Sequence, residues 1–196
     1  MNLSNHSTKE PVLNTAVFSS FPVLRTSRLL LRSIAQTDTD RIFNFYHNPQ
    51  VMQFRGADCF EFKQEASDLI QEFADLFTKG KGIRWGICMQ DKEEALIGSA
   101  GLKSINSTHL RAELGYELDP ECWNQGLMTE ALSAITAFCF NEMQLHTLEA
   151  NITPANIASE RVLEKLHFVR EAYFRENWYY KGWWDSAIFT LRNPDQ

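Results

Sequence analysis

Long apolar runs are missing from this sequence. The longest candidate, residues 131–140, contains two hydroxyl side chains and is much shorter than the ~20 residues that a membrane-spanning helix needs. The first twenty residues include Lys9, Glu10 and Pro11 but no apolar stretch of signal-peptide length. We therefore expect a cytoplasmic protein that has no membrane partner.

Cysteine is scarce, and its spacing predicts neither a disulfide framework nor a metal site. The four cysteines are Cys59, Cys88, Cys122 and Cys139. None of them belongs to a Cys-x-x-Cys pair, and no histidine lies at zinc-finger spacing from them. Reduced thiols are the usual state in the cytosol. We expect free thiols and no bound metal.

Basic residues are fewer than acidic ones, 19 against 25, which gives a net charge of −6. A nucleic-acid-binding surface needs clustered lysine and arginine, so the sequence argues against a nucleic-acid partner. A negative charge would assist encounter with a cationic substrate. A soluble acidic surface explains the same charge more simply.

The 196 residues suit one domain that follows a short N-terminal segment. We expect residues 1–20 to form a polar, weakly ordered lead-in and residues 21–196 to form the domain, because no Pro/Gly/Ser-rich linker or internal repeat divides them. Apolar periodicity predicts strands at residues 24–32, 83–89, 96–103, 112–118, 147–152, 168–174 and 186–192, and helices at residues 38–47, 62–77, between 120 and 139, and 156–165. This order predicts an α/β (α+β) protein whose mixed sheet is covered by helices on both faces.

Residues 123–132, with the sequence WNQGLMTEAL, follow a predicted strand and open a predicted helix. Unpaired amides at a helix N-terminus, together with the helix dipole, form a binding site for phosphate. Gly126 allows a ligand to approach the backbone closely. Taken alone, a single glycine before a helix more often belongs to an ordinary turn.

The same segment resembles the acetyl-CoA pyrophosphate loop of GNAT-superfamily N-acetyltransferases, which usually reads Gln/Arg-x-x-Gly-x-Gly/Ala. Trp123 takes the first position, as in the RimJ/RimL-like branch, Gly126 matches, and Met128 replaces the last small residue. Four other segments resemble that branch in the same order, namely residues 25–32, 112–116, 156–168 and 181–185. The resemblance covers residues 22–192, and it is to a branch whose members acetylate the N-termini of ribosomal proteins.

The resemblance implies a GNAT fold of about seven strands with splayed central strands, acetyl-CoA as cosubstrate, and no metal. The amides from Gln125 to Glu130 would hold the pyrophosphate, and the Thr129 hydroxyl could add a donor. The strand around Gly115 would offer backbone groups to the pantetheine arm and the thioester carbonyl. Asn156 would contact CoA, although a plain helix cap explains it equally well. The implied CoA-binding residues are Leu114, Gly115, Tyr116, Gln125, Gly126, Leu127, Met128, Thr129, Glu130, Asn156 and Ser159.

Acetyl transfer needs a base for the ammonium group, stabilisation of the oxyanion and a proton for the departing thiolate. We predict Glu113 as the base, because it alternates away from the apolar residues of its strand and the branch carries a carboxylate there; an ion-paired or solvated carboxylate is the alternative. We predict that Ser159 protonates the sulfur, because it shares a helix face with Asn156; a polar residue in a first helical turn is the alternative. Unranked candidates for the acid are Tyr116, Tyr173, Tyr179 and Tyr180.

Two further features accompany the resemblance. His167 stands where the branch prefers glycine, so a left-handed backbone at that position would be strained. Trp178, Trp183 and Trp184 crowd the C-terminal end, where they either pack the last strands or line the acceptor pocket.

The leading functional prediction is an enzyme that acetylates the α-amino group of a protein or peptide. The first alternative is acetylation of a small amine such as an antibiotic, a polyamine or an amino-acid derivative. A GNAT-fold module that senses acyl-CoA without turnover is a second alternative, which Glu113, Asn156 and Ser159 disfavour. A purely structural protein would leave the loop before Thr129 without a ligand. The oligomeric state stays open, a homodimer included.

Overall fold

The computed structural model describes residues 12–194. Its strands are β1 (Leu24–Arg25), β2 (Leu29–Ser33), β3 (Ile83–Met89), β4 (Leu96–Asn106), β5 (Arg111–Leu118), β6 (Thr147–Ile152), β7 (Val169–Tyr179) and β8 (Trp183–Arg192). Its α-helices are α1 (Thr39–His47), α2 (Pro49–Met52), α3 (Lys63–Thr78), α4 (Leu127–Asn141) and α5 (Ile157–Lys165), and its 3-10 helices are η1 (Thr15–Phe18), η2 (Gln36–Asp38) and η3 (Pro120–Cys122). No helix within residues 12–194 is long and apolar enough to cross a membrane.

The strands form one mixed sheet in the order β1-β2-β3-β4-β5-β6-β8-β7, which confirms the predicted fold class. Only the β5–β6 pair is parallel among these described neighbours. The sheet has eight strands because the predicted strand 24–32 is interrupted at residues 26–28, where Thr26 and Leu29 form a hydrogen-bonded turn.

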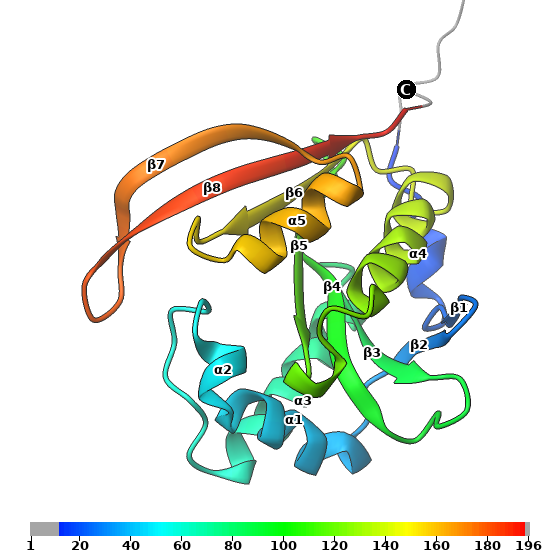
Figure 1. Ribbon diagram of the computed structural model, residues 1–196. Coiled ribbons are helices and arrows are strands. Elements are labelled where there is room, and N and C mark those ends of the chain that lie inside the picture. The colour runs from blue at the N-terminus through cyan, green and yellow to red at the C-terminus, as the bar shows by residue number, and fades with distance from the viewer. Residues whose placement is uncertain (1–11, 195–196) are drawn as a thin grey trace, which may run out of the picture.

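The sheet separates two hydrophobic cores. Along β2, Leu29 and Leu31 belong to the core that contains the α4 side chains, whereas Leu30 belongs to the core of α1 and α3. Successive side chains of a strand point to opposite faces, so this alternation places helices on both faces of the sheet. Figure 1 shows the same division, with α4 and α5 apart from α1, α2 and α3.

The central strands β5 and β6 separate along their length. Their registered pairs join only Arg111–Glu113 to Thr147–Glu149. Beyond Glu113, β5 continues beside β4 as far as Leu118, but it has no registered partner on the β6 side. This confirms the splayed central strands and opens a gap in the middle of the sheet.

The described part of the predicted lead-in packs against the domain. Leu13 is buried, and Asn14 donates its side-chain amide to the Glu142 carbonyl at 2.8 Å. Phe18 packs against Phe77 of α3 with ring centroids 5.5 Å apart. Residues 12–20 therefore contact the domain, because apolar side chains among them reach the core. Residues 1–11 of the lead-in lie outside the described part of the chain.

Strands β7 and β8 form a long hairpin that extends past the sheet and arches toward α2 (Figure 1). Its tip is fastened to the segment after α2, where the Tyr180 hydroxyl donates to Asp58 at 2.9 Å and Lys181 forms an ion pair with the same carboxylate. Trp178 lies so close to Gly56 that a Cβ there would sit 1.8 Å from the indole ring. The hairpin therefore connects the C-terminal strands to the loop between α2 and α3.

Candidate active site

The predicted pyrophosphate loop leads into the N-terminus of α4. Gly126 caps the helix in the left-handed conformation, with φ of 75°. The first intrahelical hydrogen bond runs from the Glu130 amide to the Gly126 carbonyl, at 3.0 Å. The amides of Leu127, Met128 and Thr129 precede this bond, so they have no partner within the helix. The Glu130 amide donates within the helix, so it is not available as the phosphate donor that was predicted.

The Glu130 side chain instead fastens the loop to the turn between β1 and β2. Its carboxylate accepts hydrogen bonds from the Thr26 hydroxyl at 2.5 Å, the Ser27 hydroxyl at 3.0 Å and the Arg28 amide at 2.9 Å. Arg28 adds an ion pair at 2.6 Å and donates to the Gln125 carbonyl at 3.0 Å. Burial opposes ionisation, but the hydrogen bonds from Thr26 and Arg28 outweigh it and lower the pKa of Glu130 to about 2.

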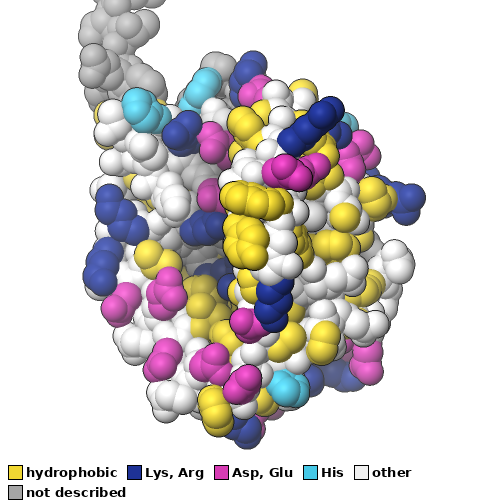
Figure 2. Space-filling model, turned by 90° about the vertical axis from the view of Figure 1, so that its left-hand side faces the viewer, with side chains coloured by type: hydrophobic (Ala, Val, Ile, Leu, Met, Phe, Trp, Pro, Cys, Tyr) yellow, Lys and Arg dark blue, Asp and Glu magenta, His cyan; other side chains and the backbone are white. Residues whose placement is uncertain are grey.

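A cavity of about 430 Å³ lies where β5 and β6 part. One wall comes from α1, α3 and the segment after α2, and the other from strands β3 to β6 and the start of α5. The face that carries the hairpin tip is hollowed, with basic, acidic and hydrophobic side chains around the hollow (Figure 2). The cavity brings together six of the predicted site residues, which are Glu113, Leu114, Gly115, Tyr116, Asn156 and Ser159. The α4 loop, residues 125–130, lies outside its lining.

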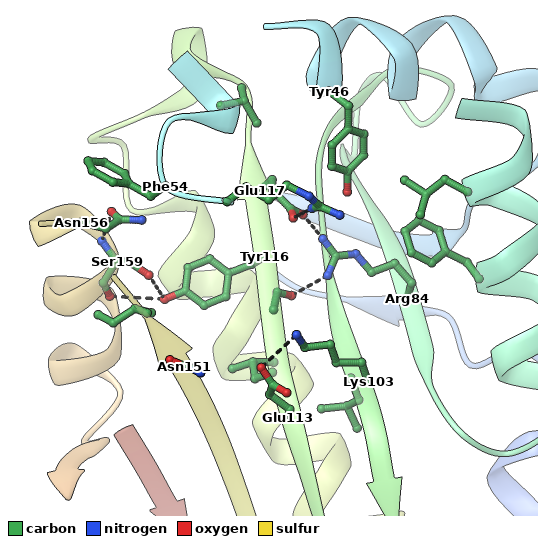
Figure 3. A pocket seen from close by; sticks show the side chains of 18 of the residues that line it. Tyr46, Phe54, Arg84, Lys103, Glu113, Tyr116, Glu117, Asn151, Asn156 and Ser159 are labelled. Atoms are coloured by element: carbon green, nitrogen blue, oxygen red, sulfur yellow. Dashed lines mark hydrogen bonds and ion pairs between the residues drawn. The ribbon is translucent and has the colours of Figure 1, made fainter. Parts of the chain in front are cut away.

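Tyr116, Ser159 and Asn156 form a connected group on one side of the cavity (Figure 3). The Tyr116 hydroxyl lies 2.6 Å from the Ser159 hydroxyl, and the Asn156 side-chain oxygen accepts from the Ser159 amide at 3.1 Å. The helix-cap interpretation of Asn156 is therefore confirmed. Burial raises the pKa of Tyr116 to about 12, so this phenol keeps its proton throughout the neutral range.

Glu113 faces the cavity from β5, paired with Lys103 of the neighbouring strand β4. Their cross-strand ion pair is 2.9 Å long, and the Glu113 side chain is 29% exposed. The ion-paired alternative is thus present in the structure. The ion pair leaves the carboxylate in the cavity, because Glu113 and Lys103 both line it (Figure 3).

The cavity also contains a charged group that the sequence analysis did not identify. Glu117 of β5 forms ion pairs with Arg84 of β3 and with Arg55 of the segment after α2. Arg84 reaches across β4, donating to the Ser99 hydroxyl at 2.9 Å and to the Gly115 carbonyl at 2.8 Å. Arg84 therefore occupies one of the two acceptor positions of that carbonyl. A single arginine between Ile83 and Trp85, in an otherwise apolar strand, was the available signal.

The remaining tyrosine candidates lie outside the cavity lining. Tyr173 donates to Asp185, and Tyr179 packs against Trp183 on the hairpin with ring centroids 5.4 Å apart. Tyr180 binds Asp58, as described above. The three tryptophans also lie outside the lining, and Trp178 packs on Trp184 at 5.1 Å. Of the four tyrosines predicted as candidates for the acid, Tyr116 alone lines the described cavity.

Comparison with known proteins agrees with this geometry. Residues 28–169 match the family model described as acetyltransferase (GNAT) domain. The uncharacterised N-acetyltransferase YoaA of Bacillus subtilis is 36% identical over 89% of this chain and 98% of the relative. The [ribosomal protein uS5]-alanine N-acetyltransferase of Escherichia coli is 27% identical over 88% of this chain and 91% of the relative. The fold is similar to that of spermidine N-acetyltransferase from Vibrio cholerae in complex with CoA and spermine, with a TM-score of 0.75, 21% identity, and coverage of 86% of this chain and 97% of that one.

The α4 loop and the β5–β6 gap have features that suit acetyl-CoA. Three backbone amides at the start of α4 lack helical partners, and Gly126 presents no side chain in front of them, so the loop fits a diphosphate. The gap between β5 and β6 beyond Glu113 leaves room for an extended arm beside β5. The match over most of the chain and the identity to YoaA agree with this fit. The chain therefore belongs to the GNAT acetyltransferase family and is an acetyl-CoA-dependent N-acetyltransferase.

Proposed function

We propose that this enzyme acetylates the α-amino group of a protein or peptide. The observation that supports the proposal is the cavity at the parting of β5 and β6, because it joins a carboxylate, Glu113, to the hydroxyl pair of Tyr116 and Ser159. The relative that acts on the ribosomal protein uS5 supports a peptide acceptor. The hollowed face in Figure 2 gives such an acceptor a route from outside.

In this proposal, acetyl-CoA supplies the activated acyl group. The amides of Leu127, Met128 and Thr129 bind the pyrophosphate, and the Thr129 hydroxyl lies in the same turn. They act together with the helix dipole, which favours negative charge at this end of α4. Arg28, held by Glu130 and the Gln125 carbonyl, keeps the loop in the conformation that leaves these amides accessible.

Two proton transfers are assigned to side chains of the cavity. Glu113 accepts the proton of the acceptor ammonium, directly or through water, since its carboxylate lines the cavity. Ser159 gives its hydroxyl proton to the departing sulfur, and Tyr116 passes its own proton to Ser159 through the 2.6 Å contact. The Tyr116 phenolate then regains a proton from water, which closes the cycle. Because the Tyr116 phenol remains protonated at neutral pH, it can act as this reservoir.

The alternative acceptor is a small amine. The structural similarity to a spermidine acetyltransferase motivates it. A panel of peptides and amines, incubated with the enzyme and acetyl-CoA and analysed by mass spectrometry, separates the two. An added acetyl group on peptide N-termini supports the proposal, whereas acetylation confined to free amines would replace it with the alternative.

Glu113→Gln tests the assignment of the base. We expect kcat to fall by about 100-fold, because general base catalysis contributes on that scale, with CoA affinity unchanged. Glu149→Gln is the matched control, since Glu149 is the register partner of Glu113 on β6, is also ion-paired, and lies outside the cavity lining. Equal kcat values for the two variants would show that Glu113 is not the base.

Gly126→Glu tests the pyrophosphate site. It places a carboxylate before the free amides and a side chain at φ of 75°, so CoA binding measured by calorimetry should be lost. Gly126→Asn is the control, because asparagine tolerates the left-handed conformation and adds no charge. Retained CoA affinity in Gly126→Glu would place the nucleotide elsewhere.

A further inference from the structure

The inner end of the cavity carries excess positive charge. One oxygen of Glu117 pairs with Arg55 and the other with Arg84, so two guanidinium groups share one carboxylate. Two positive charges against one negative leave one positive charge uncompensated. The Arg84 and Glu117 side chains are only 12% and 16% exposed, so water screens this charge weakly. Burial, and to a lesser extent the charge on Arg55, lowers the pKa of Arg84 to about 10.

The two arginines differ in how many of their donors are used. Arg84 donates to Ser99, Gly115 and Glu117, which occupies most of its guanidinium. The Arg55 guanidinium donates only to Glu117 among the residues of the described chain. Its guanidinium lies over the Tyr46 ring, 4.4 Å from the ring centroid, and its side chain is 34% exposed along the cavity. Arg55 can therefore offer further N–H groups to a ligand.

Tyr46 supplies an independent observation. Its side chain is 1% exposed, and its hydroxyl has no hydrogen-bond partner among residues 12–194. Figure 3 shows this hydroxyl directed into the cavity, toward Arg84 and Glu117. A buried hydroxyl without a partner is costly unless a ligand or water satisfies it. The hydroxyl therefore marks a place for an acceptor atom beside the uncompensated positive charge.

We propose that this end of the cavity binds a carboxylate carried by the acceptor, through Arg55 and the Tyr46 hydroxyl. The inference rests on the proposed function and defines its substrate class as an amine that also bears a carboxylate. Figure 3 shows Glu113 and the Tyr46–Arg84–Glu117 group at different ends of the cavity, so the amine faces Glu113 while the carboxylate faces Arg55. A polyamine would instead place a second positive charge beside two arginines, and is disfavoured.

Acidic side chains of the lining do not contradict this assignment. Glu113 is neutralised by Lys103, and Glu117 is already shared between the two arginines. Glu72 of α3 also lines the cavity, but it is exposed, so solvent screens its charge. The carboxylate has two sources, which are an acidic first side chain of a peptide and the carboxylate of a free amino acid.

The test compares acceptors that differ only in the carboxylate. One arm uses peptides that begin with aspartate or asparagine and are otherwise identical, and the other uses glycine and glycinamide. We expect a lower KM for the acidic member of at least one pair. Arg55→Gln should raise that KM about tenfold, because a charge-assisted hydrogen bond is lost, and should leave the neutral member within about twofold. Tyr46→Phe should act in the same direction with a smaller effect.

Arg41→Gln is the control variant, because Arg41 is exposed on α1 and does not line the cavity; it should leave both members of each pair unchanged. Equal kcat/KM for acidic and neutral acceptors would overturn the inference and leave the proposed function standing. If no acceptor is acetylated, the proposed function fails. Calorimetry on the enzyme–CoA complex then tests whether the subsite binds the carboxylate. Tighter binding of the acidic member that Arg55→Gln abolishes would support it, and equal or absent binding would overturn it.

Discussion

Glu130→Gln should destabilise the protein at neutral pH by loosening the attachment of the α4 loop. The substitution keeps the size of the side chain but removes its charge. In the structure this carboxylate accepts hydrogen bonds from Thr26, Ser27 and the Arg28 amide, and pairs with the Arg28 guanidinium. A neutral amide cannot satisfy four donors, so the turn between β1 and β2 should lose its connection to the loop.

The magnitude follows from the pKa of the carboxyl. An ordinary glutamate titrates near 4.5, whereas these donors bring the pKa of Glu130 to about 2. Each tenfold change in proton affinity corresponds to ~1.4 kcal/mol, so this difference corresponds to roughly 3 kcal/mol of folding free energy. Because the side chain remains 17% exposed, solvent screening reduces the value, and we expect a loss of about 2 kcal/mol.

The pH dependence separates the charge from other effects. A carboxyl with a lowered pKa in the folded state contributes its full stability above pH 4.5, the value for the unfolded chain, and loses it as the pH falls toward 2. Urea unfolding at several pH values should therefore show a difference between wild type and Glu130→Gln that is largest at pH 7 and shrinks below pH 4.5. Glu164→Gln, at an exposed position of α5, is the control. A difference that stays constant down to pH 3 would refute the electrostatic explanation.

Two further predictions concern the backbone. His167 follows α5 with φ of 64°, so His167→Gly should relieve backbone strain. The free energy of unfolding measured in urea should rise by about 1 kcal/mol. A lower stability would show instead that the imidazole makes a favourable contact. Gly56 has φ of 66°, and Gly56→Ala should push a methyl group into Trp178. The substitution should destabilise the protein by about 1–3 kcal/mol and speed proteolysis of the β7–β8 hairpin. Unchanged stability and cleavage would argue against the docked hairpin tip.

Local patterns predicted most elements because each depends on its own residues. Apolar alternation predicted β3 and β6 with the bounds that the structure shows, and helical spacing predicted α3 to within a residue of each end. The division of β1 from β2 was missed for a physical reason. Residues 26–28 contain no glycine, proline or asparagine to signal a turn, and the turn is held by Glu130, about a hundred residues away in the sequence.

The sequence predicted those parts of the candidate site that lie in recognisable motifs. The loop before α4, Glu113, Asn156 and Ser159 were all proposed from segments that resemble one family, and the structure places the last three around one cavity. The Arg55–Glu117–Arg84 group was not predictable in this way. Its three residues come from three separate parts of the chain, and only the packing of α2 against the sheet brings Arg55 to Glu117.

Arg84 also explains how β5 stays in place after it leaves β6. From Leu114 onward, β5 is registered only with β4, and a strand with one free edge inside a sheet could shift toward its lost neighbour. Arg84 prevents this, because it starts on β3, crosses β4 at Ser99 and binds both the Gly115 carbonyl and the Glu117 carboxylate. The gap that we assign to the cosubstrate and the charge that we assign to the acceptor site therefore depend on the same buried guanidinium. A substitution such as Arg84→Met should accordingly disturb both, whereas Arg55→Gln should affect the acceptor alone.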